Sequence, residues 1–96
     1  MKLVYRAAVL KEVREAFGWY LNEAGPRQAN VFRNELNAKV ALLMVNPGLG
    51  TPGPKNTRAM PLKVFPYTVH YRIDGDVFRV FAVSHQRRRP GYWLQH

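Results

Sequence analysis

The chain has 96 residues, which leaves room for one hydrophobic core, so a second domain is excluded and residues 1–96 are predicted to form one domain. It contains no Cys, which excludes disulfides, and no apolar run approaches a signal peptide or the roughly 20 residues of a membrane span, which predicts a cytoplasmic protein without membrane contact. Lys and Arg number 15 against 6 Asp and Glu, and the formal net charge of +9 predicts an acidic partner, either nucleic acid or protein.

The first half of the chain predicts a short strand and two helices. Residues 1–6 alternate apolar and polar side chains, as a strand does. From about Val9, one buried helical face is predicted at Val9, Val13, Phe17, Tyr20 and Ala24, and a solvated face at Lys11, Glu12, Arg14, Glu15 and Glu23. Gly25 and Pro26 favour a helix end followed by a new helix start, so a helical hairpin is expected. The buried face of the second helix is predicted at Ala29, Phe32, Leu36, Val40 and Leu43.

The second half predicts a loop and three strands. Residues 46–57 carry three Pro and three Gly, which favours a loop without regular structure. Residues 58–64 follow as a strand in which Pro61 indicates an edge position or a bulge. Residues 67–73 alternate cleanly, and Asp74-Gly75 is typical of a tight turn into a last strand that continues to His85.

A two-residue turn at Asp74-Gly75 would fix the pairing of the last two strands. It places Tyr71 opposite Phe78, Val69 opposite Val80 and Tyr67 opposite Ala82, on an apolar side that should receive the helices. The other side is then mixed and basic, with Thr68, His70, Arg72, Val77, Arg79, Phe81, Val83 and His85. This side is predicted to be either an open docking surface for something anionic or an ordinary solvated face.

An ordered series of residues runs through the last third of the chain: Phe65-Pro66-Tyr67, Tyr71, Ala82-Val83, His85, Arg88, Pro90 and Trp93. Upstream of it stand the helical hairpin, Asn46-Pro47-Gly48, Gly50 and Arg58. Together they resemble the RelE/ParE superfamily of toxins from type II toxin-antitoxin systems, especially its ParE-like plasmid stabilisation branch. The resemblance implies an α+β fold, with an N-terminal strand, an antiparallel helical hairpin and a three-stranded antiparallel sheet packed on the helices.

Three functions follow from the resemblance. We favour a ParE-like, growth-inhibiting toxin that poisons DNA gyrase by binding it, because of the ending with His85, Arg88, Pro90 and Trp93. The first alternative is a RelE-like enzyme that cleaves ribosome-bound mRNA without a metal. The second is an inactive toxin homologue that acts as an antitoxin-bound corepressor. Whether the protein is an enzyme is left open by the sequence.

The resemblance also names candidate site residues. If the protein is a ribonuclease, the predicted catalytic set is Arg58, His85 and Arg88: Arg58 and Arg88, or its neighbour Arg87, would hold the scissile phosphate. His85, or alternatively His70, would move a proton, since imidazole titrates near neutral pH. Nucleic-acid or target binding is predicted for the basic and aromatic side chains of the last two strands and the tail, namely His70, Arg72, Arg79, Phe81, Arg87, Arg88 and Arg89. The structural alternatives are a strand-end hydrogen bond for His85, a surface role for His70 and a solvated charge run at residues 87–89.

The sequence also leads to predictions about cofactors and partners. His70, His85 and His96 have no carboxylate pair nearby in the sequence, so neither a metal nor another cofactor is predicted. The resemblance implies a cognate antitoxin whose acidic C-terminal segment folds onto the toxin in a hetero-oligomer. The charge distribution agrees with this, since residues 36–96 hold nine bases and only two acids, Asp74 and Asp76.

Overall fold

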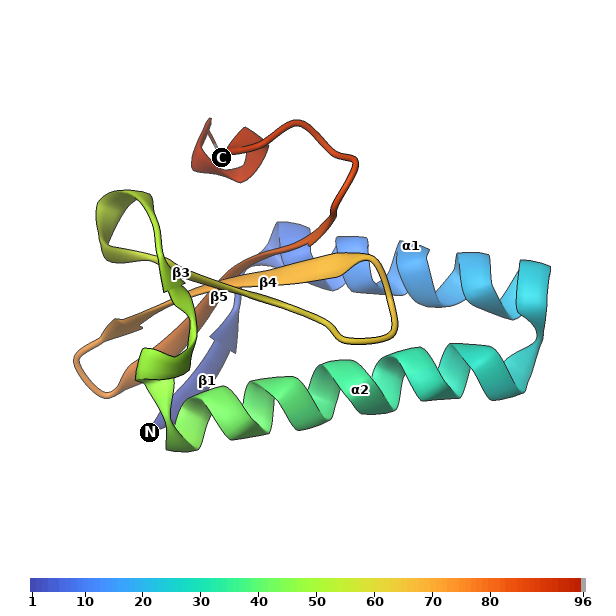
Figure 1. The fold of residues 1–96 in the computed structure, drawn as a ribbon, viewed down its shortest axis with the longest axis horizontal. Coiled ribbons are helices and arrows are strands. Elements are labelled where there is room, and N and C mark those ends of the chain that lie inside the picture. Colours follow the sequence, from blue (N-terminus) through green and yellow to red (C-terminus); the bar gives the residue numbers. More distant parts are fainter. Residues whose placement is uncertain (96) are drawn as a thin grey trace.

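The computed structural model describes residues 1–95 and places two antiparallel helices against one face of a five-stranded sheet (Figure 1). The helices are α1 (Ala7–Ala24) and α2 (Pro26–Val45), and the strands are β1 (Lys2–Tyr5), β2 (Thr51–Pro52), β3 (Arg58–Pro61), β4 (Tyr67–Asp74) and β5 (Val77–His85). The strand order is β1-β5-β4-β3-β2, with β1 parallel to β5 and the other pairs antiparallel. The predicted α+β fold is confirmed, and the sheet gains β1 at one edge and β2 at the other.

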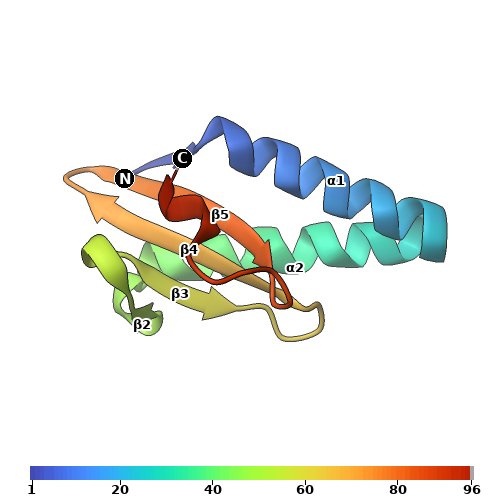
Figure 2. The same cartoon turned by 90° about the horizontal axis from the view of Figure 1, so that it is seen from above.

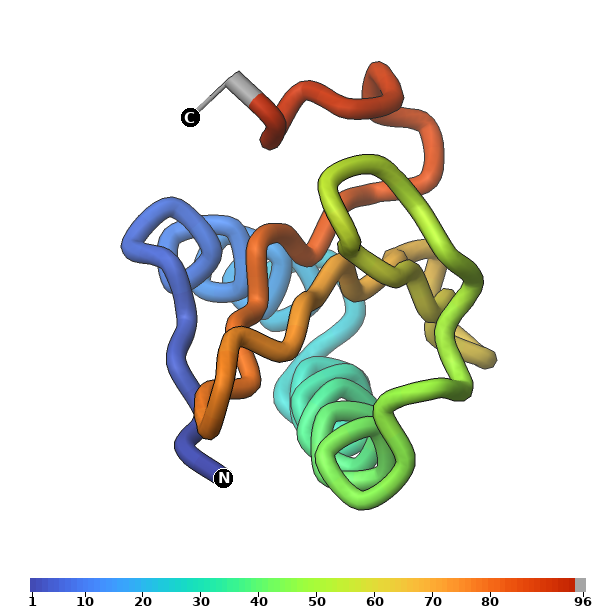
Figure 3. The backbone as a smooth tube through the Cα atoms, turned by 90° about the vertical axis from the view of Figure 1, so that its left-hand side faces the viewer, coloured from blue at the N-terminus to red at the C-terminus, as the bar shows by residue number. Residues whose placement is uncertain are grey.

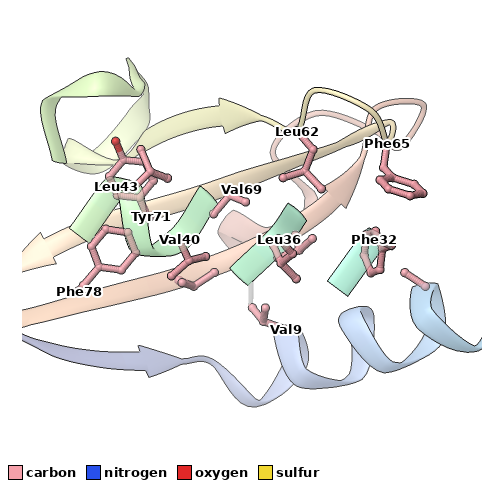
Figure 4. Close-up of a cluster of buried hydrophobic side chains, with 13 residues drawn as sticks. Val9, Phe32, Leu36, Val40, Leu43, Leu62, Phe65, Val69, Tyr71 and Phe78 are labelled. Carbon is pink, nitrogen blue, oxygen red and sulfur yellow. The ribbon is translucent and has the colours of Figure 1, made fainter. Parts of the chain in front are cut away.

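The helical hairpin follows the predicted pattern with two exceptions on α1. Gly25 separates the helices at φ 91 and ψ 171, a backbone region open almost only to glycine. The predicted core residues of α2 are all buried, and Figure 4 shows Phe32, Leu36 and Val40 among them. Ala24, predicted to be buried, is exposed, because the end of the hairpin projects past the strands (Figure 2). Glu12, predicted on the solvated face, is only 16% exposed.

The hairpin of β4 and β5 turns one residue later than predicted. Asp74 pairs with Val77, so the turn residues are Gly75 and Asp76, with Gly75 at φ 59. The predicted pairing of Tyr71 with Phe78 is therefore wrong, and Tyr71 pairs with Val80. A shift of two residues preserves the alternation of sides, so Tyr71 and Val80 are still buried against the helices, at 1% and 0% exposure.

A β-bulge at Phe81 changes the second half of β5. Tyr71 pairs with Val80 but the preceding His70 pairs with Ala82, which leaves Phe81 without a partner across the ladder. Beyond the bulge the alternation is inverted, so Val83 joins the core and pairs with Val69. His85 lies opposite Tyr67, with the ring centroids 5.2 Å apart. The prediction that Val83 and His85 share a side with His70 is therefore wrong.

The segment 46–57 is more regular than predicted. It contains two 3-10 turns, η1 (Pro47–Leu49) and η2 (Pro54–Asn56), with β2 between them. The segment is fastened to the core by Tyr71, whose hydroxyl donates to the carbonyl oxygen of Pro47 at 2.6 Å and accepts from the amide of Gly50 at 3.0 Å. These two bonds explain why a Pro- and Gly-rich stretch takes one conformation.

The connection from β3 to β4 is held by Glu35 of α2. Its carboxylate accepts from the backbone amides of Lys63 at 2.8 Å, Val64 at 3.1 Å and Phe65 at 3.4 Å. These amides bond to a side chain and not to a neighbouring strand, which is why β3 ends at Pro61 and not at Val64 as predicted. No helix among residues 1–95 is both long and apolar enough to cross a membrane.

Replacing Glu35 with Ala is expected to lower the free energy of unfolding by about 1–2 kcal/mol. Three backbone amides lose a charged acceptor, and hydrogen bonds to water compensate for this loss only in part. Urea unfolding measures the change. Glu23→Ala is the control, since Glu23 is an exposed carboxylate of α1, and a change within about 0.5 kcal/mol is expected there. Equal losses in the two variants would contradict a role for Glu35 in holding the connection.

Candidate functional site

The side of the sheet away from the helices is covered by the end of the chain itself. Residues 86–95, which we name the C-terminal tail, leave β5 and fold back across the sheet (Figures 1 and 2). Trp93 in the last 3-10 turn, η3 (Tyr92–Gln95), is 5% exposed, with its ring 4.8 Å from that of His70 and 6.0 Å from that of Phe81. The predicted open surface is therefore occupied by the protein's own tail.

His70 lies between the sheet and the tail. Its Nε2 is 2.9 Å from the hydroxyl oxygen of Ser84, and Trp93 covers the ring. Burial lowers the pKa of His70 below its ordinary value. The predicted surface role is wrong, because His70 is half-buried.

Protonation of His70 is expected to loosen the fold as the pH falls. The unfolded chain binds this proton with the ordinary pKa of 6.5 and the folded chain with a lower one, so the stability from neutral His70 is complete above pH 6.5 and is lost below it. Chemical denaturation of wild type and His70→Gln between about pH 7 and 5 tests this, and the variant should show the flatter dependence. Parallel curves would count against the assignment.

Phe81 is enclosed by cations. The guanidinium carbon of Arg6 lies 5.2 Å from the centre of its ring and that of Arg72 lies 4.8 Å from it. Arg72 is held in turn by Asp74, whose carboxylate accepts from its Nε at 2.6 Å and from Nε of Arg79 at 3.2 Å. The hydrogen bond from Arg72, more than any other cause, lowers the pKa of Asp74. Stacking of a base on Phe81 would therefore require these side chains to move.

Glu12 joins three parts of the chain. From α1 its carboxylate accepts from the amide of Val83 on β5 at 3.2 Å and from the hydroxyl of Tyr92 in the tail. Arg88 lies 3.9 Å from the same carboxylate and 3.8 Å from the centre of the Tyr92 ring. Neither Glu12 nor Tyr92 was among the predicted site residues.

The predicted catalytic residues are brought together only in part. His85 and Arg88 line one groove of about 630 Å³ beside α1, which we name the α1 groove; its other walls are Glu12, Glu15, Ala16, Trp19, Tyr20, Pro66, Tyr67 and Val83. Arg58 lies elsewhere on the sheet. It pairs with Tyr71 of β4, whereas His85 pairs with Tyr67, four residues away along the same strand. The guanidinium of Arg58 donates to the carbonyl oxygen of Gly50 at 2.7 Å. Four residues of strand span about 13 Å.

The other predicted binding residues divide between the sheet and the tail. Arg72 and Arg79 share the carboxylate of Asp74 on the strands, and Arg87 and Arg89 are exposed in the tail. No cluster of three or more His, Asp or Glu side chains suited to a metal ion occurs within residues 1–95, and His96 lies outside the described residues.

Comparisons with known proteins agree with this architecture. A solved structure of a chromosomal ParDE TA system from P. aeruginosa is similar in fold, with a TM-score of 0.76 at 17% sequence identity over 88% of this chain and 95% of that chain. The fold is thus one found in a toxin-antitoxin system. A family model described as the ParE toxin of type II toxin-antitoxin system, parDE, matches residues 3–90, and the chain belongs to this family. The predicted resemblance is confirmed. No curated protein sequence matches the chain.

Proposed function

We propose that residues 1–96 form a single toxin domain that arrests growth in the cytoplasm by binding and poisoning DNA gyrase, and that a cognate antitoxin neutralises it. Membership of the ParE toxin family supports the toxin class. The placement of Arg58 supports binding over RNA cleavage, because its guanidinium bonds to loop carbonyls and stands apart from His85 and Arg88. Cleavage without a metal needs its cations and its base around one phosphate.

A supercoiling assay tests the target. Purified protein is expected to inhibit supercoiling of relaxed plasmid by gyrase or to trap cleaved plasmid. Replacing the three tail arginines, Arg87, Arg88 and Arg89, with Gln should weaken inhibition, because these residues are exposed whereas the predicted contacts on the strands are half-buried. Arg14→Gln on α1 is the matched control. Gyrase that stays active at doses that arrest growth would reject this target.

Inducing expression of the protein in growing cells separates the two alternative functions. Cuts in ribosome-bound mRNA, mapped at 5′ ends after induction, would reassign the protein as a RelE-like endoribonuclease. Harmless expression of the free protein would instead identify an inactive homologue that serves as an antitoxin-bound corepressor.

The antitoxin surface we propose is a second groove, of about 340 Å³, between β1 and the two helices. Its walls combine apolar side chains with two arginines and no acid: Tyr5, Leu10, Val13, Arg14, Phe17, Arg33, Leu36 and Asn37. This composition suits an amphipathic segment with an apolar face and acidic edges. Charge would speed the encounter and the apolar side chains would supply most of the affinity.

We therefore expect the toxin-antitoxin complex to survive moderate salt. Size-exclusion chromatography across a salt series measures this, and Leu10→Asp in the groove should dissociate the complex, whereas Leu42→Asp on α2 should not. The two leucines are similarly accessible, at 51% and 48% exposure, which makes the pair a matched control. Dissociation of the wild-type complex at moderate salt would show that the interface is mainly ionic.

A further inference from the structure

A small pocket is lined by residues from the start of α1, the segment 46–57, the sheet and the C-terminal tail. Figure 3 shows the backbone of the segment 46–57 (yellow-green) and of the tail (red) on the same side of the strands. The pocket has a volume of about 160 Å³ and is lined by Arg6, Lys55, Thr57, Arg72, Phe81, Trp93 and Leu94. Three of these residues are cations and none is an acid. We propose that this pocket binds a phosphate group, either one within a nucleic-acid strand or that of a free phosphate compound.

Two of the three cations lie against one aromatic ring. Arg6 approaches Phe81 from the end of β1 and Arg72 approaches it from β4, with guanidinium carbons 5.2 Å and 4.8 Å from the ring centre. Lys55 belongs to η2, and its carbonyl oxygen accepts from Arg72 at 3.2 Å. Segments distant in the sequence thus bring positive charge to one place, which is the arrangement that binds a compact anion.

The local carboxylate does not balance this charge. Asp74 is shared by the guanidinium groups of Arg72 and Arg79. Arg6 donates one described hydrogen bond, at 3.0 Å, to the neutral carbonyl of Trp93. A guanidinium has five N–H donors, so most of the donor capacity of Arg6 remains for a ligand. A neighbouring hollow shares Arg6 but is also lined by Glu12 and Glu15, so the pocket around Phe81 is the more positive of the two.

The backbone of η2 is held in an unusual conformation beside the pocket. Lys55 and Asn56 both lie in the left-handed region, at φ 55 and φ 62. This conformation is unfavourable for Lys and persists only where surrounding contacts enforce it, as they often do at ligand sites. Here it directs the Lys55 carbonyl to Arg72, and Lys55 is one of the residues that line the pocket.

The proposal is tested by measuring how the full chain binds two probes, inorganic phosphate and a short fluorescent single-stranded oligonucleotide. Phosphate is followed by amide shifts at Thr57, at constant ionic strength, and the oligonucleotide by anisotropy. Arg6→Gln and Lys55→Gln should each weaken binding by about tenfold or more and reduce the salt slope for the oligonucleotide by about one. Arg27→Gln, an exposed arginine at the start of α2, should change affinity less than about twofold.

Each outcome is informative. Weakened binding of both probes identifies a nucleic-acid strand as a source of the phosphate, and weakened binding of inorganic phosphate alone identifies a free phosphate compound. Undiminished binding in Arg6→Gln and Lys55→Gln, or an equal loss in Arg27→Gln, overturns the site. Lys55→Gln is needed because Arg6 also holds the Trp93 carbonyl, whereas the Lys55 side chain does not. The proposal goes beyond gyrase binding, and either result of the supercoiling assay leaves it testable.

Discussion

Gly50→Ala is expected to lower the free energy of unfolding by about 3 kcal/mol, because it combines overpacking with the loss of a buried hydrogen bond. A Cβ atom at this position would overlap the hydroxyl oxygen of Tyr71 and would lie 2.9 Å from its Cε1 and 3.0 Å from Cβ of Arg58. Tyr71 cannot give way easily, since it is 1% exposed and stacks on Phe78 at 4.9 Å. Urea unfolding measures the loss.

Gly48→Ala is the matched control, because a Cβ atom there meets nothing within 4 Å, and a change within about 0.5 kcal/mol is expected. A double-mutant cycle with Tyr71→Phe tests the cause. Removing the hydroxyl relieves the overlap, so the double variant should be more stable than the sum of the single losses predicts, by about 1 kcal/mol. Strict additivity would show that Gly50 is required for a reason other than its contact with Tyr71.

The sequence predicts correctly which side chains of β4 face the core, although the assumed register is wrong. Alternation along residues 67–73 depends on β4 alone, so it is kept although the partner on β5 shifts by two residues at Tyr71 and by three at Val69, beyond the bulge. The pairing depends on the turn, where an Asp-Gly pair and a Gly-Asp pair overlap at residues 74–76. Glycine at the first turn position, with φ 59, selects the second of these.

The covered face and the bulge could not be predicted from local patterns. Phe81 carries no local signal for a bulge, since neither Gly nor a polar turn residue stands there, and the contacts around its ring come from Arg6, Arg72 and Trp93. Periodicity predicts that one face of a strand pair is apolar, but it does not say what covers the other. The surface role given as the alternative for His70 is therefore wrong, because the ring of Trp93, distant in the sequence, lies against that of His70.

Glu12 is the site residue whose position the sequence could have indicated. It follows Val9 by three residues and precedes Ala16 by four, and both of these are buried, at 0% and 5% exposure. A helix places all three side chains on one face. The charge of Glu12 favoured the solvated face in the prediction, whereas the structure supplies a backbone amide, a hydroxyl and a guanidinium as its partners. A charged residue inside an apolar stripe therefore indicates a partner from elsewhere in the chain.

Glu12→Ala is expected to release the C-terminal tail and to lower the free energy of unfolding by about 2–3 kcal/mol, because the amide of Val83 and the hydroxyl of Tyr92 lose their acceptor. Release is measured in a Trp19→Phe background, which leaves Trp93 as the one tryptophan of the chain. Its emission should shift to the red as the ring leaves His70. Glu15→Ala is the control, since its ion pair with Lys11 is exposed and should contribute at most about 0.5 kcal/mol.

The same variant links the tail to the α1 groove. Glu12 and Arg88 line that groove and also contact Tyr92, so a ligand carboxylate that paired with Arg88 would compete with Glu12 for it. In the Trp19→Phe background, a ligand that occupies the α1 groove should therefore shift the Trp93 emission of the otherwise wild-type chain and leave that of Glu12→Ala unchanged. A shift of equal size in both proteins would mean that the groove acts on the tail without Glu12.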